Sequence, residues 1–148
     1  MKRFHFELDA LLDKFAWDVD ILRTEKASAS LAVEAQQKEL RSLEEQIREC
    51  HDSLLKISGE DAEISIAQRQ VLGNYLRYKL DLSKTACVSL EKAQAIEQQI
   101  VEQLLDTSQR LKTVEKLKEH GKLKHDYLRM RAESNESDEN WLTRRNHT

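Results

Sequence analysis

Apolar residues recur in alternating steps of four and three along the first 57 residues of the chain. Beginning at Leu8, 13 of the 15 positions in this register are apolar, counting Ala and Cys. A repeat of 3.5 residues is typical of a helix that supercoils around a partner helix. The pattern therefore predicts a helix over about 5–57 with one face in a coiled-coil interface. We interpret its two polar positions, Lys26 and Gln36, as residues that specify the register, with contact to a separate partner as the alternative.

The clearest break in this pattern lies at residues 58–61, which read Ser-Gly-Glu-Asp. Glycine readily adopts the left-handed conformation that ends a helix, and acidic residues favour the start of the next one. Residues 62–72 then read as a short helical piece that ends near Gly73. We therefore expect a turn segment over 58–73 between two long helices.

A second apolar register begins at Leu72 and is poorer than the first, and it predicts a second helix over about 74–131. Polar residues interrupt it at five positions: Lys79, Ser83, Glu97, Thr107 and Lys118. An offset stripe beside it predicts a stutter of the register near residue 82. The members of this stripe are Val71, Tyr75, Tyr78 and Leu82.

Two long helices with a short connection most simply form an antiparallel hairpin. The predicted fold class is all-α, an antiparallel two-helix coiled-coil hairpin over 1–131 with a short helical segment at the turn. If the chain reverses at 58–73, residue i faces about residue 131 − i. Cys50 then lies about six residues, or roughly 9 Å, from the level of Cys87, which is too far for a disulfide bond. We expect this hairpin to be a monomer in isolation.

Residues 132–148 have no segment opposite them on this pairing and begin with an acidic polar stretch, so we expect a frayed or disordered tail. Half of all residues are Ala, Glu, Lys, Leu or Arg, glycine occurs three times and proline is absent. Sheet folds need turn residues and β-branched runs that this chain lacks. No apolar run is long enough for a transmembrane segment or a signal peptide, so the expected location is cytoplasmic.

A two-helix coiled coil offers no cavity in which several elements converge, so we expect a protein that is not an enzyme. The sequence has no phosphate-binding glycine loop, no nucleophile-elbow motif and no zinc-protease motif. His120 and His125 are five residues apart, whereas a metal site on one helix face needs a spacing of three or four. We therefore expect no cofactor, no metal, no small-molecule substrate and, at a net charge of −3, no nucleic acid.

Apolar and basic residues gather in excess at three places. Phe4, Phe6, Phe15 and Trp17 fall within the first 17 residues, and they exceed the one face that a partner helix can bury. Either they pack locally on the second helix or they bind a partner. Residues 110–131 carry eight Lys or Arg against three acidic residues, a local charge of +5. These cations either complement the helix dipole near the C-terminus of the second helix or bind an acidic partner surface. A third excess follows the turn, at Tyr75, Leu76, Tyr78, Leu80 and Leu82.

The start of the chain resembles the opening of the FliJ family of flagellar export proteins. The similarity lies in Phe4, Phe6, Leu8, Leu11 and Leu12, followed by a long heptad pattern. The chain length is similar as well, as are a helix break near residue 59 and a Tyr/Leu-rich segment at 71–78. A basic run at 115–118 and the polar end at 140–145 extend the resemblance over most of the chain.

The resemblance implies a non-enzymatic coiled-coil stalk of the flagellar type III export apparatus. Such a stalk inserts into the hexameric export ATPase ring, promotes its assembly and activity, and links it to the membrane export gate, with export chaperones as further partners. It is cytoplasmic and peripherally associated with the inner-membrane export apparatus. Carried over to this chain, the resemblance assigns ring binding to Phe4, Phe6, Leu8, Leu11 and Leu12 and to the basic residues of 110–131, among them Lys116, Lys118, Lys122 and Lys124. The excess of apolar residues at the start of the chain adds Trp17 to this set. The resemblance assigns gate binding to Tyr75, Leu76 and Lys79.

Three alternatives remain at the level of the sequence. The stalk protein of virulence-type secretion injectisomes resembles the chain in the same features. A prefoldin-like chaperone is also a helical hairpin of this size, but it needs β-hairpins between its helices, and residues 61–72 lack the alternation for one. A plain coiled-coil dimer needs an equally good seam in the second half of the chain.

Overall fold

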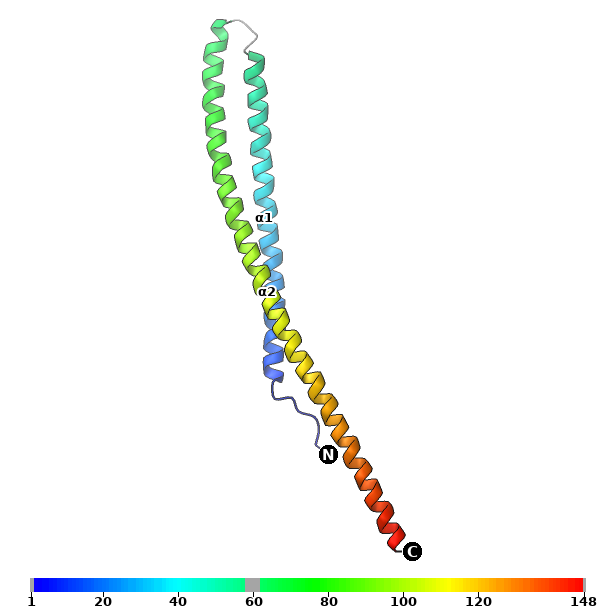
Figure 1. The fold of residues 1–148 in the computed structure, drawn as a ribbon. Coiled ribbons are helices and arrows are strands. Elements are labelled where there is room, and N and C mark those ends of the chain that lie inside the picture. The colour runs from blue at the N-terminus through cyan, green and yellow to red at the C-terminus, as the bar shows by residue number, and fades with distance from the viewer. Residues whose placement is uncertain (1, 58–61, 148) are drawn as a thin grey trace. The chain divides into compact units, whose positions relative to one another are not determined.

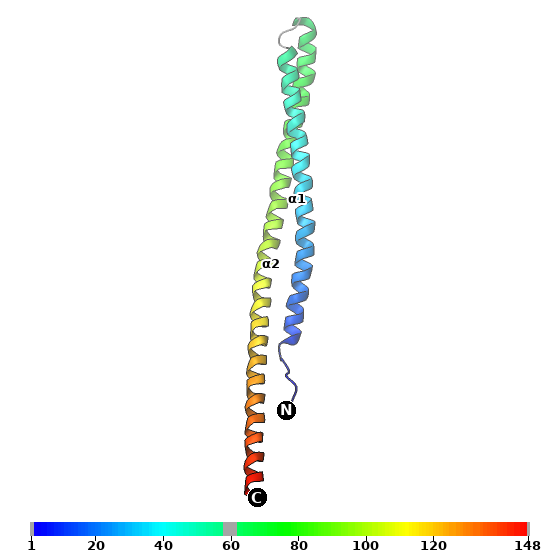
Figure 2. The ribbon, with the colours of Figure 1, turned by 90° about the vertical axis from the view of Figure 1, so that its right-hand side faces the viewer.

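The computed structural model describes residues 2–57 and 62–147, with side chains from residue 66 onward in the second range. It contains two long helices, α1 over Asp9–Ile57 and α2 over Ala62–Asn146, which pack against each other (Figures 1 and 2). The described residues contain no strand. The chain is therefore an all-α two-helix hairpin, as the heptad pattern predicts.

The hairpin divides into two compact units, and both helices contribute to each. The terminal unit combines Met1–Ile21 with Leu104–Thr148, and the loop unit is Leu22–Gln103. Val19 and Val114 are the buried apolar residues of the terminal unit. In the loop unit they are Val33, Leu43, Cys50 and Ala86.

The first heptad register lies in the interface between the helices, as predicted. Of its 15 positions, 13 are buried or half-buried, and the exceptions are Leu8 and Lys26. Gln36 is half-buried, which fits a polar residue that specifies register. Lys26 is exposed and does not fit that interpretation. A lysine at the edge of a seam can extend its ammonium group into water, so its presence there does not select one register.

The second register is continuous, and the predicted stutter near residue 82 is wrong. Alternating steps of four and three from Leu72 reach His125 through positions that are all buried or half-buried, including the five polar interruptions. Three members of the offset stripe are exposed instead: Val71 at 68%, Tyr75 at 42% and Tyr78 at 58%. An unbroken helix can keep only one 3.5-residue register against its partner, and small or long-stemmed polar residues can occupy it.

The helix boundaries differ from the predicted ones at three places. The first helix begins at Asp9, not near residue 5; the predicted short helix at 62–72 is the first part of α2; and α2 runs through Gly73. The predicted turn at 58–61, with Gly59, lies outside the described residues. With no proline in the chain, Gly73 alone costs only about 1 kcal/mol and does not end a helix.

The predicted disordered tail is helical to Asn146, although every side chain from Tyr127 to His147 is exposed. Local contacts within the helix support it. Arg129 Nε lies 3.9 Å from Glu133 Oε1, and the hydroxyl of Thr143 donates a hydrogen bond of 2.8 Å to the carbonyl of Glu139. The guanidinium of Arg145 lies 5.4 Å from the ring centroid of Trp141. The disorder that the acidic composition predicted is therefore wrong for residues 132–146.

The pairing of the two helices is shifted from the expected 131 − i. In the loop unit the Cys50 thiol lies 3.5 Å from the carbonyl oxygen of Leu72, where residue 81 was expected. In the terminal unit Asp9 pairs with Lys118 instead of residue 122. The shift follows from the early start of α2, because the chain reverses in fewer residues than predicted. Cys50 and Cys87 are both free, one buried and one exposed, so the expected absence of a bond between them is confirmed.

Candidate protein-binding surfaces

The segment before α1 lies along α2 in the terminal unit, with its blue trace beside the orange part of that helix (Figures 1 and 2). His125 Nε2 lies 3.0 Å from the carbonyl oxygen of Lys2 and donates a hydrogen bond to it. The Phe4 ring tilts against the His125 ring, with 5.5 Å between their centroids. Asp9 closes the segment through an ion pair of 2.8 Å with Lys118. Residues 2–9 thus form a strap on α2.

Gly121 provides the surface on which Phe4 rests. A Cβ built on Gly121 would lie 3.5 Å from Phe4 Cζ, which is ordinary van der Waals contact. Phe4 is half-buried there, and so is Phe6. The sequence offered both local packing and partner binding for these aromatic residues. The structure places Phe4 in a contact within the chain.

The remaining apolar candidates of the terminal unit divide by exposure. Leu12 is half-buried in the seam, whereas Leu8 and Leu11 are 40% and 36% exposed. Trp17 is 69% exposed, and Ile21, one turn further along α1, is 42% exposed. The spacing of four residues places Trp17 and Ile21 on one face of α1, away from the buried Val19. We call this pair the α1 outer patch.

The basic candidates lie on α2 in the same unit. Lys116, Lys122 and Lys124 are exposed, and their charges face water. Lys118 differs from them, because it is half-buried and held by Asp9. Three of the four lysines are therefore available to steer an acidic partner, and the fourth fastens the strap.

The loop unit holds the second candidate surface. Tyr75 is 42% exposed, Leu76 is half-buried, and Lys79 places its ammonium 5.4 Å from the centroid of the Tyr75 ring. An open groove of about 500 Å³ lies beside them, between the end of α1 and the start of α2. Its lining residues are Ser53, Ile57, Ala67, Gln68, Val71 and Leu72.

Several exposed apolar residues of this surface escaped the sequence reasoning. Leu55 is 71% exposed and Ile66 is 66% exposed, close in sequence to the lining of the groove. Leu55 follows a seam position directly, so its place on the outer face could have been read from the heptad. Ile66 could not, because the early start of α2 was not predicted.

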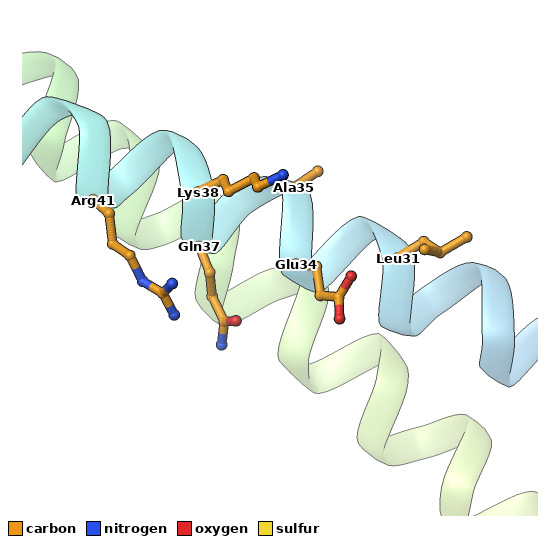
Figure 3. Close-up of a pocket in the computed structure, with 6 residues that line it drawn as sticks. All are labelled: Leu31, Glu34, Ala35, Gln37, Lys38 and Arg41. Carbon is orange, nitrogen blue, oxygen red and sulfur yellow. The ribbon is translucent and has the colours of Figure 1, made fainter.

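A second hollow lies on the surface of α1. It has a volume of about 500 Å³, and Figure 3 shows its lining residues as side chains that project from α1 alone. They are Leu31, Glu34, Ala35, Gln37, Lys38 and Arg41. A substrate pocket needs polar groups that converge from several elements, and these groups spread outward along one helix.

No cluster of three or more His, Cys, Asp or Glu within the described residues could hold a metal ion. Neither helix, over its described residues, has a stretch long and apolar enough to cross a membrane. No protein-family model, no curated protein and no solved structure matches the sequence.

Proposed function

We propose that this protein is a non-enzymatic coiled-coil stalk of a flagellar type III export apparatus, which inserts into the export ATPase ring and promotes its activity. The resemblance of its first twelve residues and its heptad layout to the FliJ family motivates the proposal. A helical hairpin with exposed apolar and basic surfaces supports it. In this role the terminal unit binds the ring, and the loop unit binds the membrane export gate.

The observation that carries the proposal is the α1 outer patch. Trp17 is 69% exposed although the strap, the seam and α2 are all in place around it. Intrachain packing therefore does not account for this aromatic residue, and a large exposed aromatic is the kind of anchor that dominates protein interfaces. Exposed lysines in the same unit would raise the rate of encounter with an acidic surface.

The proposed ring-binding residues fall into three groups according to their exposure and their contacts within the chain. Leu8, Leu11, Trp17, Lys116, Lys122 and Lys124 retain exposed surface for a partner. Phe4 and Lys118 hold the strap on α2, and they would act on ring binding through the position of the strap. Phe6 and Leu12, both half-buried, would contribute their exposed edges.

Gate binding would use the Tyr75 ring and the exposed apolar residues around the groove of the loop unit. Lys79 packs its charge against Tyr75, so the two side chains would meet a partner as one cationic and aromatic surface. An injectisome stalk protein would use the same surfaces and remains the alternative. A prefoldin-like chaperone is disfavoured, because residues 62–72, where it would need β-hairpin strands, belong to α2.

The test is stimulation of the purified export ATPase of the same organism by wild-type protein and by variants. Trp17→Ser should reduce stimulation by about tenfold or more, because truncating a buried interface aromatic costs about 2 kcal/mol or more. The matched control is Leu31→Ser, since Leu31 is 66% exposed on α1 but belongs to the loop unit. Circular dichroism should be unchanged in both. Full stimulation by Trp17→Ser, or equal loss in both variants, would contradict the proposal.

A further inference from the structure

The C-terminal part of α2 is a helix with no packing partner in the described part of the chain. The strap ends against His125 through Lys2, and every side chain from Tyr127 to His147 is exposed. Helices of this length are marginal in water when nothing buries one of their faces. A surface that covers this helix would therefore stabilise it.

An apolar strip runs along this part of α2. Alternating steps of four and three from position 123 give Leu123, Tyr127, Met130, Ser134, Ser137 and Trp141. Its four large members are 60–66% exposed. Position 123 lies about 200° around the helix from Gly121, on which the strap rests. The strip is therefore accessible while the strap is in place.

The strip has a symmetry that a second copy of the chain could use. Each position i has a counterpart in the strip at 264 − i, so an antiparallel copy would place Leu123 opposite the Trp141 of that copy. Tyr127 would meet Ser137, and Met130 would meet Ser134. Large residues would then face small ones, which is how helix surfaces interdigitate. Such a two-fold contact uses the same patch on both copies.

The charges of α2 also select an antiparallel copy as the occupant. Residues 110–131 carry a net charge of +5, and residues 132–143 carry four acidic residues and no basic one. A partner of a single sign complements only one of these adjacent segments. An antiparallel copy complements both, because its acidic segment lies over residues 121–132, which carry four Lys or Arg against one acidic residue. A parallel copy would oppose like charges.

We propose that the C-terminal part of α2, over about 123–141, is a self-association surface that pairs two copies of this chain antiparallel, with residue i near residue 264 − i of the other copy. The overlap spans about 28 Å of helix, which is short for a coiled coil. The association should therefore be weak, with a Kd on the order of 10 µM. The inference does not rest on the proposed stalk function, and it replaces the expectation of a monomer, which was drawn from the hairpin over 1–131.

A charge-swap experiment tests the pairing. Lys124 and Asp138 flank the strip and would lie close to each other across the contact. Sedimentation equilibrium of the full chain over a concentration series should show dimers. Lys124→Glu and Asp138→Lys should each weaken the association about tenfold, since two symmetric pairs turn from attractive to repulsive. The double variant should restore it. The two residues lie about 21 Å apart along one helix, so a rescue cannot arise within one chain.

The control is Lys92→Glu, which makes the same charge change at an exposed position of α2 in the loop unit and should leave the dimer unchanged. Trp141→Ser, also at an exposed position, should weaken the dimer. A monomer at every concentration would overturn the proposal, and the apolar strip would then be a binding surface for a different protein. Two results would overturn the antiparallel pairing. One is that Lys92→Glu weakens the dimer as much as Lys124→Glu does, and the other is that the double variant does not restore the affinity.

Discussion

At the scale of single residues, the strap shows how one aromatic side chain can hold a chain end on a helix. Phe4 packs on Gly121 and His125, and Lys2 and Asp9 fasten the segment on either side of it. His125 Nδ1 is buried without a hydrogen bond, 3.8 Å from Asp126 Oδ1, so the hydrogen bond from Nε2 to Lys2 fixes the ring. Sequence reasoning named the aromatic residues but left open whether they pack on the second helix or bind a partner.

Gly121→Ala should raise the free energy of unfolding by about 1 kcal/mol, because alanine is the better helix former and its Cβ meets Phe4 at an ordinary contact distance. Thermal unfolding followed by circular dichroism measures this. Gly73→Ala is the control for helix propensity alone, since a Cβ at Gly73 meets no atom within 4 Å. Destabilisation by Gly121→Ala alone would show that Phe4 requires a closer approach than the structure has.

At the scale of the helix, α2 tolerates a seam that its sequence interrupts repeatedly. Thr107 and Lys118 lie half-buried in the same continuous register as the buried Val114. The period of the helix sets which positions face α1, and the chemistry of single residues sets only how much each contributes. The offset stripe misled the prediction, because Tyr75 and Tyr78 are apolar enough for a core but lie on the exposed side.

Thr107→Leu should raise the free energy of unfolding by about 1–2 kcal/mol, because it adds buried apolar area at a half-buried seam position. Thr113→Leu is the matched control: it makes the same substitution at an exposed position of α2, and it reports the gain in helix propensity. Chemical denaturation of both variants gives the difference. Equal stabilisation by the two substitutions would mean that position 107 does not face α1.

At the scale of the whole molecule, the level at which each residue of α1 meets α2 depends on the length of the connection. The expected pairing assumed a turn over 58–73 and placed Cys50 near residue 81. The observed connection is shorter, since α2 begins at Ala62, and Cys50 lies beside Leu72. The candidate surfaces lie at other levels as a result, because the strap reaches Gly121 and His125 and the side chains from Tyr127 to His147 are exposed.

A disulfide bond can check this pairing in the loop unit. In a Cys87→Ser background, Leu72→Cys should form a bond with Cys50 on mild oxidation, because the Cys50 thiol already lies 3.5 Å from the Leu72 carbonyl oxygen. Asp81→Cys is the control at the level first expected, about 13 Å further along the helix, and it should remain reduced. Non-reducing mass spectrometry distinguishes the two. A bond between Cys50 and residue 81 instead would contradict the observed pairing and support the longer turn over 58–73.

The sequence alone was enough to predict the all-α two-helix class and the face of α1 that enters the interface. These features follow from local periodicity and composition, which each segment of the chain carries independently. Only the tertiary structure decided the pairing level, the strap and the helical state of 132–146, since these depend on where distant segments meet and not on the residues of one segment. The packing of Phe4 on Gly121 is the clearest case, because the two lie 117 positions apart along the chain and no local pattern connects them.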